Sequence, residues 1–317
     1  MREVISFTRD VAVLSSIQSV GATVGVPVVA YFMSGGEPST DLVALAAGLI
    51  FLHFSLFAHN DIEDMEADRE AGRTDKPLAS WKLSMTVAMV YSSVMLVVGS
   101  VIIWYFLSLE TFLLTSVGVM LGLVYNRFSS TTPWGSPLLG AWGVVIVSAG
   151  ASAGGGYGTP TGIFAMLTGV SLSLVTFYAD AADCATDQHS FALSMGYKQE
   201  EGVILGTTKS MAVVSAGVLL QLFLFIPLWQ MEGLYSILSA AMLGVSIATV
   251  LVMESFMMRE EKFRKLLVVY TLATVAALMM VAAPYAGELV VTVISGLVVG
   301  WAILSMRLFY GSVVEYA

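Results

Sequence analysis

The chain has a single cysteine, Cys184, among its 317 residues. A disulfide within the chain is therefore excluded, and so is a zinc site built on paired cysteines. Charged residues are also scarce at 12%, which is about half their share in a soluble domain. Only 14 residues are Lys or Arg against 23 Asp and Glu, and the net charge of −9 argues against nucleic acid as a partner.

Apolar runs make up most of what remains. Hydrophobic residues account for 57% of the chain, and its mean hydropathy is +0.84. Each run is close to the roughly 20 residues that a helix needs to cross a membrane. We therefore predict an all-α, polytopic membrane bundle that forms one domain over residues 1–317. The predicted spans are 11–33, 42–59, 83–107, 111–126, 136–153, 161–179, 208–228, 234–256, 265–283 and 289–308.

The basic residues all fall on one side of this ten-span order. They are Arg2, Arg9, Arg69, Arg73, Lys76, Lys82, Arg127, Lys198, Lys209, Arg259, Lys262, Arg264, Lys265 and Arg307. The loops on the opposite side carry only acids: Glu37, Asp41, Glu110, Glu232 and Glu288. The positive-inside rule makes the basic side cytoplasmic, so we expect a multi-pass protein of the cell membrane with this orientation.

Two acidic clusters share the spacing D-x-x-D-x-x-x-D. The first is Asp61, Asp64 and Asp68, preceded by Asn60, and the second is Asp180, Asp183 and Asp187. Each acid of the second cluster follows its counterpart by 119 residues (180 minus 61, 183 minus 64, 187 minus 68). On a helix, positions i, i+3 and i+7 share a face. Four spans separate the clusters, which predicts a parallel repeat of two four-helix blocks with both motif loops, about 60–82 and 180–207, on the cytoplasmic side.

Bunched carboxylates repel one another unless cations neutralise them. Oxygen donors of this kind favour Mg²⁺ or Ca²⁺, and Mg²⁺ is commonly shared between carboxylates and a substrate phosphate. Arg69, Arg73 and Lys76 follow the first cluster, where they either bind phosphate oxygens or only mark the topology. An anionic head held beside an apolar interior suggests an isoprenoid diphosphate. The simpler alternative is a pair of solvated acidic loops that cap helix ends.

These residues resemble the signatures of UbiA-type intramembrane prenyltransferases. Residues 60–68 match N-D-x-x-D-x-x-x-D, and Arg73 with Lys76-Pro77-Leu78 matches the basic residue and the basic-Pro-Leu turn that follow it. Residues 178–187, Tyr-Ala-Asp-Ala-Ala-Asp-Cys-Ala-Thr-Asp, are similar to the second signature. The resemblance implies a helical bundle of nine spans around a central cavity, in which an isoprenyl group passes from a diphosphate donor to a lipophilic or aromatic acceptor, as in quinone or lipid biosynthesis.

The resemblance also implies a role for each motif residue. Two Mg²⁺ ions would clamp the diphosphate, one held by Asn60, Asp64 and Asp68 with Asp61 close by, the other by Asp183 and Asp187. Arg73 and Lys76 would contact the diphosphate. Arg127, two residues after Tyr125, either reaches the diphosphate or only follows the positive-inside rule. Asp180 would hold or deprotonate the acceptor. Tyr125 and Tyr178 would stabilise an allylic cation through their ring faces, or would only anchor the helix ends at the membrane interface.

The second motif departs from the family pattern on both sides. Ala179 stands where many members carry a basic residue, and Gln188 and Phe191 replace a common basic residue and glycine. Lys198 is a candidate to supply the missing positive charge. These changes leave the aspartates intact. They alter the charge of the site and the part of it where the resemblance places the acceptor.

Three other functions use similar residues. A cation exchanger built from repeats would also carry acids, although usually in mid-span and often in inverted repeats. A phosphatidyl-transferring enzyme would use one compact aspartate motif. A UbiA-like terpene cyclase would share the metal site and need no external acceptor.

Overall fold

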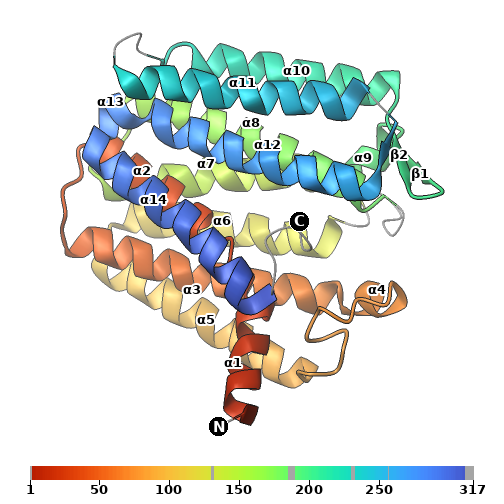
Figure 1. Ribbon diagram of the computed structural model, residues 1–317. Helices are drawn as coiled ribbons and strands as arrows, with labels where there is room; N and C mark the ends of the chain where they lie inside the picture. The colour runs from red at the N-terminus through yellow and green to blue at the C-terminus, as the bar shows by residue number, and fades with distance from the viewer. Residues whose placement is uncertain (1, 130–131, 185–189, 230–232, 256, 311–317) are drawn as a thin grey trace.

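The computed structural model describes residues 2–129, 132–184, 190–229, 233–255 and 257–310. Within these ranges nine helices are long and apolar enough to cross a membrane (Figure 1). They are α3 (Thr40–Glu63), α5 (Met85–Phe106), α6 (Leu109–Phe128), α7 (Gly135–Ala153), α8 (Thr159–Ala182), α10 (Thr208–Phe225), α11 (Leu234–Ser255), α12 (Glu260–Val281) and α14 (Glu288–Ser305). The prediction of an all-helical, multi-pass membrane bundle is confirmed.

The first predicted span is not one continuous helix. It is broken into α1 (Arg2–Leu14) and a shorter apolar helix, α2 (Val20–Met33). In the break, the hydroxyl of Ser15 donates to the carbonyl of Val11 at 2.8 Å, and Ser16 has a positive φ of 43°. Serine side chains that bind nearby carbonyls compete with helical hydrogen bonding. The prediction of an unbroken helix over 11–33 is therefore wrong.

Short elements join the long helices. They are α4 (Met65–Glu70), α9 (Phe191–Ser194), α13 (Ala283–Ala286) and a π-helical turn, Met306–Tyr310. Three short strands, β1 (Lys198–Glu200), β2 (Val203–Leu205) and β3 (Met258–Arg259), form an antiparallel sheet in the order β1-β2-β3. No sequence pattern predicts these strands, which are only two or three residues long.

Side-chain caps fix where several long helices begin. The hydroxyls of Ser39, Ser84 and Ser108 accept the backbone N–H three residues on, at 3.4, 3.3 and 3.2 Å. Thr207 and Ser210 form a reciprocal capping box at the start of α10. Each cap satisfies a donor that the first turn of a helix leaves unpaired. The starts of α3, α5, α6 and α10 are thus set locally by sequence.

The two helices that carry the acidic clusters, α3 and α8, end on the same side of the bundle. Helix α4 and strands β1 and β2 lie beyond them at the right of Figure 1. We call this side, which contains residues 60–82, 180–184 and 190–207, the motif end, and the opposite side the far end. Because both clusters lie at the motif end, the structure brings the two halves of the proposed site to one face.

The internal repeat extends to the helix boundaries. Helices α3 and α8 each contain 24 residues, and both ends of α8 lie 119 residues after those of α3 (159 minus 40, 182 minus 63). The last residue of α10 follows the last residue of α5 by the same interval (225 minus 106). The repeat is therefore a repeat of structure as well as of acidic residues.

Burial separates inner helices from outer ones. In α3 and α8, 50% and 56% of the membrane-spanning residues are buried, against 22% in α5, 22% in α10 and 17% in α14. The outer helices present apolar side chains such as Leu219, Leu297 and Trp104, all more than half exposed, as expected where lipid replaces water. The motif helices are thus the inner ones, next to the interior of the bundle.

Candidate active site

The first cluster lies where α3 passes into α4. Asn60 and Asp61 belong to the last turn of α3, Asp64 joins the two helices, and Asp68 lies in α4. The backbone N–H of Asp64 donates to the carbonyl of Asn60 at 2.9 Å, so the helical path continues through the junction. The side-chain amide of Asn60 donates to a carboxylate oxygen of Asp64 at 2.8 Å. The predicted helical face is therefore formed.

Lys76 reaches into this cluster from the loop that follows it. Its ammonium group donates to Asp61 and lies 3.9 Å from a carboxylate oxygen of Asp68. Burial alone would lower the pKa of Lys76, but attraction to Asp61 and Asp68 outweighs it and raises the pKa. Burial raises the pKa of Asp64 to about 6, and the neighbouring carboxylates of Asp68 and Asp61 add to that rise. The cluster thus concentrates negative charge that cations stabilise.

Arg73 connects the two clusters electrostatically. Its guanidinium makes two hydrogen bonds of 3.1 Å to the carboxylate of Asp75. That hydrogen bonding, together with attraction to Asp75, Asp68 and Asp183, raises the pKa of Arg73. Asp68 belongs to the first cluster and Asp183 to the second, so the positive charge of Arg73 is attracted to acids of both clusters.

The second cluster begins inside the last turn of α8. The hydroxyl of Ser136, at the start of α7, donates to Asp180 at 2.9 Å. Asp183 follows the last residue of α8 and accepts a hydrogen bond from Arg264 of α12 at 2.7 Å. The predicted third acid, Asp187, lies outside the described residues, so its predicted role as a ligand stays a prediction.

Arg264 contacts the second cluster, which the sequence does not predict. From the sequence it counts only among the basic residues that indicate topology. Besides Asp183, its guanidinium binds the carbonyl of Ala182 at 3.1 Å and Glu260 at 3.0 Å. It thereby brings a positive charge to the motif that lacks its usual basic neighbours. Lys198, the expected substitute, is exposed on β1.

Of the other predicted side chains, Arg127 and Tyr178 have partners of their own. Arg127 binds Glu63 at 2.7 Å, with 67% of its side chain exposed. Tyr178 is fully buried, and its hydroxyl donates to Glu254 of α11 at 3.0 Å. Tyr197 donates to the same carboxylate oxygen. Tyr178 therefore lies in a hydrogen-bond network that ties the end of α8 to α11.

A central cavity of about 360 Å³ opens beside the first cluster. Side chains of α2, α3, α6, α7, α8 and α12 line it, and most of them are apolar. Asn60, Tyr125 and Asn126 contribute its lining at the motif end. The side-chain amide of Asn126, which sequence reasoning also missed, donates to the carbonyl of Leu56 at 2.8 Å. The predicted central cavity is present, and Tyr125 faces it.

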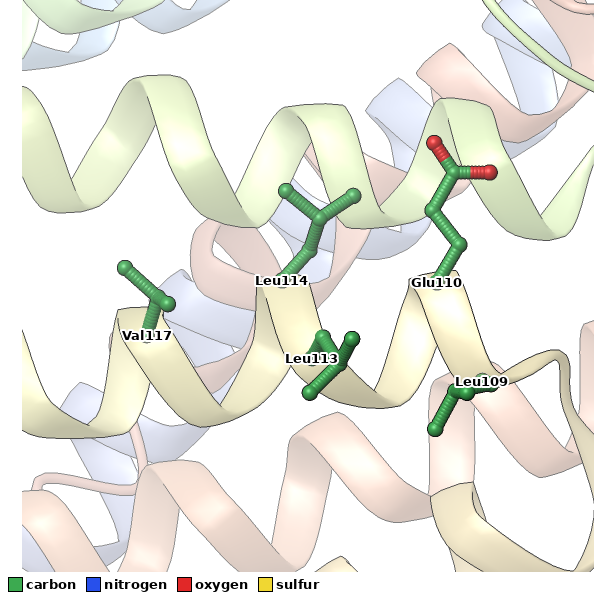
Figure 2. Close-up of a pocket in the computed structure, with 5 residues that line it drawn as sticks. All are labelled: Leu109, Glu110, Leu113, Leu114 and Val117. Carbon is green, nitrogen blue, oxygen red and sulfur yellow. The ribbon is translucent and has the colours of Figure 1, made fainter.

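A second hollow lies at the other end of α6 (Figure 2). It has a volume of about 400 Å³ and is lined by Leu109, Glu110, Leu113, Leu114 and Val117 of that single helix. Glu110 is in the first turn of α6, at the far end of the bundle. Because this hollow is remote from both aspartate clusters, we assign the chemistry to the central cavity.

The donor atoms present suit a hard divalent cation. Asn60, Asp61, Asp64 and Asp68 offer only oxygen ligands, which Mg²⁺ prefers. Among the described residues no three acidic, histidine or cysteine side chains converge closely enough to hold an ion alone. Mg²⁺ normally keeps several waters and shares its remaining positions with substrate phosphate, so a few carboxylates at the mouth of the cavity are an adequate set.

Three solved structures share this fold. A UbiA homologue from Aeropyrum pernix K1 in its apo form has a TM-score of 0.64 at 17% identity, covering 82% of this chain and 96% of that one. A digeranylgeranylglyceryl phosphate synthase has a TM-score of 0.62 at 17% identity, covering 88% and 99%. A UbiA homologue from Archaeoglobus fulgidus, bound to DMAPP and Mg²⁺, has a TM-score of 0.60 at 15% identity, covering 94% and 99%.

Sequence comparison agrees with the fold. No curated protein matches the chain. The model of the UbiA prenyltransferase family, however, matches residues 20–265. That range runs from the first residue of α2 into α12 and contains both aspartate clusters and Arg264. The chain belongs to the UbiA prenyltransferase family.

Proposed function

We propose that the protein transfers an isoprenyl group from an isoprenyl diphosphate to a lipophilic or aromatic acceptor inside the membrane. The observation that carries the proposal is an apolar cavity whose mouth is lined by Asn60 of the first aspartate cluster. A diphosphate suits the charged mouth, and a hydrocarbon tail suits the interior. Family membership and a homologue bound to DMAPP and Mg²⁺ support the same donor class.

The aspartate clusters are the proposed metal-binding residues. Asn60, Asp61, Asp64 and Asp68 would hold one Mg²⁺, and Asp183 and Asp187 a second. When bound, these ions neutralise the diphosphate and stabilise the charge that grows on it as it leaves. Lys76 pairs with Asp61 and lies 3.9 Å from a carboxylate oxygen of Asp68, and it would turn toward the diphosphate once ions occupy the cluster.

The remaining polar residues would orient the donor and the acceptor. Arg73 lies in the field of both clusters and would bind diphosphate oxygens. Arg264 fixes Asp183, and Ser136 fixes Asp180. We keep Arg127 and Lys198 as outer contacts to the diphosphate, because both are exposed at the motif end.

Charge development dictates the order of the reaction. The allylic C–O bond breaks, the electron pair leaves with the diphosphate, and the acceptor donates an electron pair to the resulting carbon cation. The acceptor then loses a proton, which Asp180 would accept at the motif end. The ring of Tyr125, on the cavity wall, would stabilise the cation, and the apolar wall would exclude water. Tyr178 is left out of this role, because it is bound to Glu254.

The proposal includes the setting of the enzyme. Residues 1–317 would form one catalytic domain in the cell membrane, with surrounding lipid against its outer helices. The motif end would face the cytoplasm, because the basic residues of the 60–82 loop lie there. An accessibility test with a membrane-impermeant thiol reagent on Lys82→Cys in oriented vesicles, in a Cys184→Ser background, checks this orientation.

Diphosphate release tests the reaction and separates the alternatives. Purified protein with Mg²⁺ should release diphosphate from an isoprenyl diphosphate and form a prenylated product when an acceptor is present. Release that yields only a cyclic hydrocarbon without an acceptor would indicate a terpene cyclase. Cation flux in liposomes without any release would indicate a transporter and would overturn the proposal.

A further inference from the structure

The central cavity has a packed floor at its far end. Val26, Val147 and Leu278 line the cavity and also belong to the largest buried cluster of the protein among the described residues. Behind them, Phe164 and Ala282 are completely buried. A chain that enters at the motif end therefore meets close-packed side chains before it reaches the far end.

Helices α2 and α7 also touch backbone to backbone at this depth. A Cβ atom added to Gly150 would lie 2.2 Å from the carbonyl oxygen of Pro27, and one added to Gly154 would lie 2.1 Å from that of Tyr31. The two backbones therefore lie too close together for a hydrocarbon chain to pass between the helices. The glycines thus seal the cavity wall where a long tail would need to continue.

The depth available to a tail, measured from the second acidic cluster to the floor, follows from positions on the helices that line the cavity. Thr168, in the lining, precedes Asp180 by twelve residues on α8 (180 minus 168), which is about 18 Å at the helical rise. Val147 follows the first residue of α7 by the same number (147 minus 135). Each extended isoprene unit adds four carbon–carbon bonds, or about 5 Å. The depth therefore accommodates three to four units.

The small volume of the cavity also favours a short tail. At about 360 Å³, the cavity is near the lower limit of the range, about 300–1,000 Å³, that small-molecule pockets occupy. A short tail suits such a space, whereas an extended tail of eight units, at about 5 Å per unit, is about twice as long as the available depth of about 18 Å.

We propose that Val147, Thr168 and Leu278 form a floor that limits the donor to an isoprenyl diphosphate of at most four isoprene units. The proposal rests on the proposed function for the identity of the donor. It adds a limit on donor length, which follows from this chain's own packing. Thr168 is held in place by a hydrogen bond from its hydroxyl to the carbonyl of Phe164 at 2.9 Å.

The test compares donors of two, three, four, six and eight isoprene units with the full-length protein. We expect kcat/KM to rise up to three or four units and to fall at least about tenfold at six and eight. Equal or higher kcat/KM with eight units would overturn the floor. If no donor releases diphosphate, the proposed function fails. In that case the limit on tail length is tested by binding alone. The rise in unfolding temperature is measured with isoprenyl thiolodiphosphates of the same tail lengths, which need not react.

Variants at the floor assign the effect to these residues. Val147→Ala with Leu278→Ala deepens the cavity and should shift the preferred donor toward longer tails, whereas Thr168→Phe should shift it toward two units. Leu297→Ala and Leu219→Phe, both on exposed faces, are the matched controls and should leave the profile unchanged. If Thr168→Phe fails to fold, the paired alanine variant still decides. An unchanged profile in that variant would contradict the assignment.

Discussion

Arg264 of α12 donates a hydrogen bond of 2.7 Å to the carboxylate of Asp183 at the end of α8. These residues lie 81 positions apart in the sequence and meet because α8 and α12 pack together at the motif end. Arg264 thus brings a positive charge to the second acidic motif from a different helix. The motif itself has no basic residue beside Asp180.

The first prediction concerns this pair. Arg264→Ala should lower kcat/KM by about 10–100-fold, because a residue that orients a metal ligand has effects of that size. Its effect on the free energy of unfolding should be below about 1 kcal/mol, since the pair is partly exposed. Lys265→Ala, which removes a pair with Glu261 on the same helix, is the control. Equal activity of both variants would show that Arg264 does not act at the site.

The second prediction concerns Lys76. Removing this cation leaves the buried carboxylate of Asp61 without its partner, so Lys76→Ala should destabilise the metal-free protein by about 3–5 kcal/mol. Added Mg²⁺ should recover much of that loss by binding the folded state. Thermal unfolding in detergent with and without Mg²⁺ measures both effects. Lys82→Ala, whose ammonium binds only the carbonyl of Thr74 among the described residues, should show neither.

The third prediction follows from the pKa of Asp64, which burial raises to about 6. A raised pKa means that the folded protein binds the proton more tightly than the unfolded chain. The stabilisation from this group is therefore complete below about pH 4 and is lost as the pH rises through 6. Asp64→Asn should remove this pH dependence and should raise the metal-free stability at pH 7 by about 1–3 kcal/mol. Chemical denaturation at pH 5 and pH 7 in the presence of a chelator measures the difference, and an unchanged dependence would contradict the assignment.

The fourth prediction separates the two tyrosines. Tyr125→Leu should lower kcat with little change in stability, because its ring faces the cavity. Tyr178→Phe should instead reduce stability by about 1 kcal/mol, because it removes a hydrogen bond to Glu254, and should leave kcat nearly intact. Kinetics and thermal unfolding on both variants make the comparison. A large loss of kcat in Tyr178→Phe would contradict this assignment and would indicate that Tyr178 acts in catalysis.

The sequence was sufficient for much of the fold. Continuous apolar runs predict long helices whose ends differ by only a few residues from the structure, as with 83–107 against Met85–Phe106. It failed where short polar side chains act locally. Ser15 and Ser16 interrupt an otherwise apolar run, and the three strands are too short to leave a periodic pattern. Both features depend on contacts that composition does not reveal.

The site was predictable where its residues are neighbours in sequence. The i, i+3, i+7 spacing placed Asp61 and Asp68 on one face, where both now lie near Lys76. Contacts between helices could not be predicted in this way. Arg264, Ser136 and Asn126 reach the site through packing, and Tyr178 turns toward Glu254 instead of the cavity. A single sequence predicts which residues share one face of a helix, but it does not predict which helices pack together.

The central claim is that both aspartate clusters act on one diphosphate. Its most direct test is Mg²⁺-dependent diphosphate release from farnesyl diphosphate by the wild type, Asp64→Asn and Asp183→Asn, each confirmed as folded in detergent. We predict release by the wild type with an acceptor present, and a loss of at least about a hundredfold in each variant. Wild-type rates in both variants would contradict the account.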